Sequence, residues 1–164
     1  MEIRVKLIGN DISLGTTLLL LPKDAYDTYT KTTGAVPDMC GNTGLLVIDP
    51  SQFQRLQSLS FVISNVIMRS FTISMESYSF HFFFLDQVAF DLIPNAQIYP
   101  RHFNTAIGGV ASKIYLVIGE LEGDTDGLRF VMGMVFLQRY MSIYDSGNQQ
   151  VGFAKTPKTN AVSN

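Results

Sequence analysis

The apolar residues of this chain occur in short runs broken by Gly, Pro, Asn and Asp, with one exception between residues 22 and 34. Short runs rich in Val, Ile, Phe and Tyr are typical of strands joined by turns. The pattern therefore predicts a mainly β fold with one or two short helices. The predicted strands are residues 16–21, 44–48, 58–63, 88–92, 98–100, 113–119, 129–133, 141–145 and 150–154.

Two segments depart from the strand pattern and predict the short helices. The first lies between Pro22, which can occupy a first helical turn, and Gly34, which can end a helix. The second begins near Val135, directly after Gly133, because the apolar residues there fall on one helical face. We expect both helices to be minor, peripheral elements of a fold that consists mainly of sheets.

Composition limits the size of the fold and its partners. A chain of 164 residues with 46% hydrophobic residues can build one core, so we expect one domain. The net charge is −2 and the basic residues are scattered, which disfavours binding to a nucleic acid. Charged residues interrupt every long apolar region, which argues against a membrane-spanning segment.

The N-terminal residues and the cysteine content leave the compartment open. Residues 1–14 lack the basic segment, apolar stretch and small-residue cleavage site of a secretory signal. Cys40 is the single cysteine, so an intrachain disulfide is excluded.

Residue types that bind metals or act as nucleophiles are sparse. His81 and His102 are the two histidines, and Cys40 has no partner at zinc-ligand spacing. No nucleophile-elbow or phosphate-loop motif occurs. The acidic segment at 120–127, ELEGDTDG, could suggest calcium, but it lacks the twelve-residue ligand pattern, so a solvated turn is the better interpretation. We expect no metal or organic cofactor.

Two segments near opposite ends of the chain carry a family resemblance. Residues 15–22 read GTTLLLLP, and residues 130–137 read FVMGMVFL and continue as QRYMSIYD. The second resembles the C-terminal signature of pepsin-like aspartic endopeptidases, peptidase family A1. The first resembles the segment that follows the second catalytic aspartate of that family. The resemblance runs over residues 15–160 with one interruption, and it is strongest for the fungal secreted branch.

The resemblance implies a bilobal, mostly β enzyme in which each lobe contributes one aspartate to a shared water. Two carboxylates about 3 Å apart share one proton there, because both cannot ionise together. This chain is similar to the C-terminal lobe, so the implied partners are a polypeptide substrate and the missing N-terminal lobe. The family also implies an extracellular location.

The chain departs from the family motif at the catalytic position. Ser13 stands where the family carries its aspartate, Leu14 replaces the following threonine, and Asp11 lies two residues too early. A serine hydroxyl does not ionise near neutral or acid pH, and a homodimer would bring together two serines. We therefore expect no catalytic residue and no peptidase activity in this chain alone.

Gly15, Thr16 and Thr17 match the family motif, and the resemblance implies that they help to bind the substrate backbone. An ordinary turn before a strand explains the same three residues, and that alternative stays open. The segment 131–133, VMG, resembles the stretch that crosses behind the catalytic loop and implies a scaffold role.

Residues 64–87 interrupt the resemblance where the family has a short turn. Residues 80–84 of this segment include four phenylalanines, where a hairpin tip should be polar. We interpret it as a translated intron, and residues 1–14, which do not match, invite the same hypothesis. The alternative is a genuine aromatic insertion that binds a partner.

Two functions therefore follow. The first is an aspartic endopeptidase, present here as a partial and inactive C-terminal lobe. The second is a noncatalytic pseudo-protease that acts as a protein-binding or inhibitor-like module. A lone lobe would expose the surface that normally faces its partner lobe, so we expect aggregation or low expression.

Overall fold

The computed structural model describes residues 2–6, 15–41, 43–64, 87–122, 130–147 and 150–162. Asp11, Ser13 and Leu14 lie outside these ranges. So do His81, most of the interruption at 64–87 and part of the acidic segment at 120–127.

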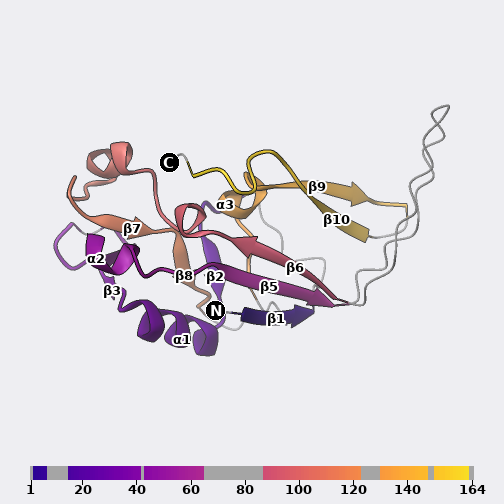
Figure 1. The fold of residues 1–164 in the computed structure, drawn as a ribbon, viewed down its shortest axis with the longest axis horizontal. Helices are drawn as coiled ribbons and strands as arrows, with labels where there is room; N and C mark the ends of the chain where they lie inside the picture. Colours follow the sequence, from indigo (N-terminus) through magenta and orange to yellow (C-terminus); the bar gives the residue numbers. More distant parts are fainter. Residues whose placement is uncertain are drawn as a thin grey trace.

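One three-stranded sheet contains β1 (Glu2–Lys6), β5 (Leu59–Ser64) and β6 (Gln87–Leu92), in the order β1-β5-β6. β1 runs parallel to β5, and β5 pairs antiparallel with β6 (Figure 1). Ser64 is paired with Gln87, so the two ends of the interruption are neighbours across the sheet.

A second three-stranded sheet is antiparallel and has the order β3-β4-β7, from β3 (Val36–Pro37), β4 (Leu46–Ile48) and β7 (Ile114–Leu116). β2 (Leu19–Leu21) pairs parallel with β8 (Ile118–Glu120). β9 (Tyr140–Asp145) and β10 (Gln150–Lys155) form an antiparallel pair to one side of the molecule (Figure 1).

Both predicted helices are present. α1 (Lys23–Thr33) begins after Pro22 and ends at Gly34, whose φ of 70° lies in the left-handed region that glycine adopts without strain. α3 (Met134–Leu137) follows Gly133. The sequence pattern did not predict α2 (Pro50–Phe53) or the 3₁₀ helices η1 (Pro94–Ala96) and η2 (Arg101–Ile107).

Some predicted strands are shorter or divided. The strand predicted at 16–21 forms only as β2, and the strand predicted at 113–119 divides at Val117 into β7 and β8. Among the described residues of the segments 98–100 and 129–133, Ile98 and Val131 form isolated bridges with Leu116 and Leu20 in place of full strands. The reason is local: Val117 donates to the carbonyl of Gln97 and accepts from Leu19, so the chain changes partners there.

An aromatic cluster joins α3 to the two sheets on either side of it. The rings of Phe136 and Tyr140 stack with centroids 4.8 Å apart, and Phe90 meets Tyr140 edge-on at 5.3 Å. Phe153 of β10 meets Phe136 at 5.2 Å. All four side chains are buried. The Tyr140 hydroxyl also donates to the Asp91 carbonyl, so its polar end is satisfied.

No helix in the described parts of the chain is long and apolar enough to cross a membrane.

Candidate functional site

The predicted substrate-contacting residues lie at the entrance to β2. Gly15 and Thr17 are exposed, and Thr16 is half-buried. The Thr16 hydroxyl accepts a hydrogen bond from the N–H of Leu18 at 3.2 Å, which holds the segment in a tight turn. The segment 15–18 is thus a turn rather than the first half of a strand.

The start of α3 fixes the backbone of this turn. The N–H groups of Met134 and Val135 donate to the carbonyls of Thr16 and Thr17 at 3.0 and 3.3 Å. The first N–H groups of a helix have no partner within the helix, so these two carbonyls supply partners that α3 lacks. The turn is held by its main chain, which leaves the Thr17 side chain facing outward.

Gly133 makes the close approach possible. A Cβ at this position would lie 2.1 Å from the Leu18 carbonyl oxygen and 2.7 Å from that of Thr16, closer than any side chain tolerates. The scaffold role predicted for residues 131–133 therefore has a geometric basis, because only a residue without a side chain fits against the turn.

β2 is enclosed on both edges directly after the turn. Leu20 exchanges two hydrogen bonds with Val131, and the N–H of Leu19 donates to the carbonyl of Val117 on the other side. The side chains of Leu19 and Leu21 are fully buried. The structure thus brings together the two segments, near opposite ends of the sequence, that carry the family resemblance.

The other sequence candidates do not gather into a site. Within the described ranges, no group of three His, Cys, Asp or Glu residues could hold a metal ion. Cys40 is exposed, and His102 is an exposed residue of η2 whose ring lies 3.9 Å from that of Phe103. Glu120 lies 3.9 Å from the Lys23 ammonium, so the start of the acidic segment takes part in an ordinary surface ion pair.

Asp38 organises the loop that contains Cys40. Its carboxylate accepts from the N–H groups of Cys40 and Gly41 at 3.2 and 3.1 Å, and from the Thr43 hydroxyl at 2.9 Å. These hydrogen bonds, led by that from Gly41, lower the pKa of the Asp38 carboxyl. The carboxylate is therefore used to shape a loop.

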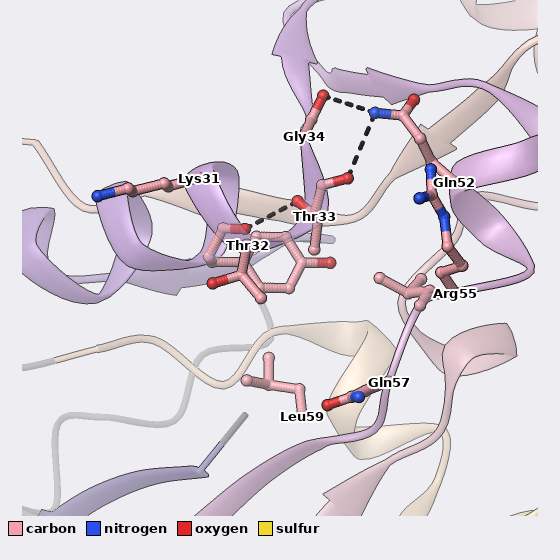
Figure 2. Close-up of a pocket in the computed structure, with 10 residues that line it drawn as sticks. Lys31, Thr32, Thr33, Gly34, Gln52, Arg55, Gln57 and Leu59 are labelled. Carbon is pink, nitrogen blue, oxygen red and sulfur yellow. Dashed lines mark hydrogen bonds between the residues drawn. The ribbon is translucent and has the colours of Figure 1, made fainter.

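Sequence reasoning missed a cavity of about 360 Å³ between α1, α2 and the segment before β5 (Figure 2). Ten residues line it: Tyr29, Lys31, Thr32, Thr33, Gly34, Gln52, Arg55, Leu56, Gln57 and Leu59. They come from three elements without a common motif. The one sequence signal nearby is the capping box of α2, in which Gln52 faces Asp49.

Comparison with known proteins gives consistent matches. The family model described as eukaryotic aspartyl protease matches residues 6–156. Polyporopepsin from Irpex lacteus is 42% identical over 154 residues, which cover 93% of this chain and 38% of polyporopepsin. Human gastricsin is 27% identical over 143 residues, which cover 87% of this chain and 29% of gastricsin.

A solved structure agrees with the sequence matches. The crystal structure of the aspartic proteinase from Irpex lacteus superposes with a TM-score of 0.71 at 39% identity, covering 93% of this chain and 38% of that one. The chain thus spans well under half the length of the relatives it matches.

Proposed function

The chain belongs to the eukaryotic aspartyl protease family and has the mainly β, pepsin-like fold predicted from its sequence; on that premise we propose that it is the C-terminal lobe of an acid endopeptidase. In such an enzyme an aspartate pair activates water to hydrolyse a polypeptide. As it stands the lobe is partial and inactive.

The observation that best supports this proposal is the fixed turn at residues 15–18. Met134, Val135 and Gly133 hold its backbone, while Gly15 and Thr17 stay exposed. Because α3 engages the Thr16 and Thr17 carbonyls, the turn is preorganised, and its exposed Thr17 side chain can meet an extended peptide at low entropic cost. This geometry supports a substrate-contacting role for Gly15, Thr16 and Thr17.

The sequence just before this turn explains the proposed inactivity. Ser13 occupies the position of the family's aspartate, and its hydroxyl cannot replace a carboxylate as general base. Loss of a general base costs about 10²- to 10⁴-fold in rate, and groups that act as a unit fail together.

A second lobe would cover the apolar face of β9. Met141 and Ile143, two positions apart on the same face of the strand, are each 53% exposed. Clustered apolar exposure of this kind marks an interaction surface.

Ser13 also favours a second candidate function, a noncatalytic protein-binding or inhibitor-like module. In that case the same turn would hold a polypeptide without cutting it. A purified, monodisperse chain that binds polypeptide without cleaving it, and that gains no hydrolysis from Ser13→Asp and Leu14→Thr when the other lobe is supplied, would support the second function.

The test is a complementation assay. The chain is co-expressed with the part of polyporopepsin that lies outside its match, once as it is and once with Ser13→Asp and Leu14→Thr, and casein hydrolysis is followed at acid pH. We expect hydrolysis only with the double variant. Hydrolysis by the purified chain alone, abolished by Asp11→Asn, would overturn the proposal.

Two further proposals concern the origin of the chain. An extracellular location follows from the family rather than from a signal in residues 1–14. Residues 64–87 and 1–14 are proposed to derive from intron sequence, with a partner-binding aromatic insertion as the alternative. Transcript reads that retain codons 65–85 at high abundance would contradict the intron origin.

A further inference from the structure

The cavity between α1 and α2 has rigid walls. The Gln52 amide donates to the carbonyls of Thr33 and Gly34 at 3.4 and 2.9 Å, and its oxygen accepts from the N–H of Asp49 at 2.6 Å. One side chain therefore ties the end of α1 to the start of α2. A cavity of about 360 Å³ with fixed walls is large enough for a ligand the size of a short peptide.

The floor of the cavity is apolar. Tyr29, Leu56 and Leu59 are 2%, 9% and 1% exposed, so only their edges face the opening. The Tyr29 hydroxyl donates a buried hydrogen bond to Gln97, so its polar end already has a partner. An apolar group can therefore rest on the floor without leaving a buried polar group unpaired.

The rim offers unused donors. Arg55 and Gln57 are exposed, and within the described parts of the chain neither side chain makes a hydrogen bond or an ion pair. Figure 2 shows Gln57 beside Leu59 at the opposite side of the cavity from Thr32 and Thr33. Two planar donor groups thus stand at the edge of an apolar floor.

The charge at the rim has one sign. The described lining residues include Arg55 and Lys31 and no carboxylate. The Lys31 ammonium points away from the cavity along the outside of α1 (Figure 2), so it adds a general positive field rather than a contact. Two of the last carbonyls of α1, those of Thr30 and Thr33, accept from the Gly34 N–H and the Gln52 amide, which reduces the repulsion that a helix C-terminus exerts on an anion.

We propose that this cavity binds the carboxylate of an acidic peptide, with Arg55 and Gln57 as donors and an adjacent apolar side chain on Leu56 and Leu59. A single guanidinium forms two parallel hydrogen bonds to a planar carboxylate. Phosphate groups are held by clusters of arginines, and Arg55 stands alone among the lining residues described. The site is independent of the proteolytic role.

Binding to the purified chain tests the site. The probes are acetyl-Leu-Glu-Leu-amide, acetyl-Leu-Gln-Leu with a free C-terminal carboxylate, and the neutral acetyl-Leu-Gln-Leu-amide, titrated by amide chemical shift at neutral pH. The two charged peptides distinguish a side-chain carboxylate from a terminal one. We expect saturable binding of at least one, weakening as salt is raised, and none of the neutral peptide.

Variants locate the contact. Arg55→Gln should weaken binding by about tenfold or more, Arg55→Lys should retain part of it, and Lys155→Gln, an exposed cation on β10, should leave it unchanged. Circular dichroism confirms that each variant folds. Equal binding of the neutral peptide, an unaffected Arg55→Gln variant, or no saturable binding up to about 10 mM would each overturn the proposal.

Discussion

The hydroxyl of Tyr29 donates a 2.9 Å hydrogen bond to the side-chain oxygen of Gln97, and both side chains are buried. The Gln97 amide donates in turn to the carbonyls of Gln57 and Leu92 at 2.9 and 2.8 Å. One buried network therefore joins α1 to the end of the β5–β6 pair at which β5 begins and β6 ends. Burial raises the pKa of the Tyr29 hydroxyl, which stays protonated and serves as a donor.

Tyr29→Phe is expected to destabilise the fold. It removes the donor and leaves the Gln97 oxygen buried without a partner, which costs about 1–3 kcal/mol. Urea denaturation measures the difference. Tyr144→Phe is the control, because Tyr144 is 56% exposed. Equal stability of Tyr29→Phe and the native chain would show that the network contributes nothing.

Gly133→Ala is expected to displace the turn at residues 15–18. The added methyl group would lie 2.1 Å from the Leu18 carbonyl oxygen, so either the turn or α3 must move, at a cost of about 1–3 kcal/mol. Gly152→Ala is the matched control, since a Cβ there meets nothing within 4 Å. Thermal unfolding compares the two, and similar midpoints would contradict the close approach.

The sequence predicted those elements whose first or last residues are typical of helix ends. Pro22 and Gly34 mark the ends of α1, and Gly133 precedes α3 as expected. The family resemblance also identified which distant segments meet, because both carry motif residues. It could not show that residues 15–18 form hydrogen bonds with α3 instead of extending β2. That outcome depends on which N–H groups the folded chain places next to the carbonyls of the turn.

The cavity lay beyond sequence reasoning for a related physical reason. Its donors, Arg55 and Gln57, look like ordinary polar residues between α2 and β5. They become a candidate site only when Gln52 fixes α1 beside them, and that contact spans elements without periodicity or a shared motif.

Asp38→Asn is expected to lower stability at neutral pH and to have less effect in acid. The hydrogen bonds from Gly41, Thr43 and Cys40 place the folded pKa of Asp38 below its ordinary value of 3.8. Because the pKa of this carboxyl is lower in the folded than in the unfolded protein, its full stabilisation is present at pH values above the unfolded-state pKa. This stabilisation is lost as the pH falls through the folded-state pKa.

Melting temperatures of both proteins from neutral pH downward check this expectation. The difference should be largest at neutral pH and should shrink below the ordinary value of 3.8. The effect is small because the carboxyl is only half-buried and water screens it. A difference that grows on acidification would contradict the assigned hydrogen bonds.

Arg139→Gln is expected to release the C-terminal segment. The guanidinium donates to the carbonyls of Ala161, Lys158 and Asn95 at 2.6, 3.1 and 3.4 Å, and the Thr159 hydroxyl donates back to the Arg139 carbonyl at 2.6 Å. Burial lowers the pKa of Arg139, which still leaves it charged.

Loss of the three hydrogen bonds from the guanidinium should cost about 1–3 kcal/mol and should speed hydrogen exchange at residues 156–162 more than elsewhere. Lys155→Gln, which removes an exposed charge from β10, is the control for a general charge effect. Exchange that rises evenly over the whole chain in Arg139→Gln would mean that the arginine stabilises the fold as a unit. Faster exchange confined to the last residues would show that Arg139 anchors this segment to η1 and β9, because its other contacts would remain intact.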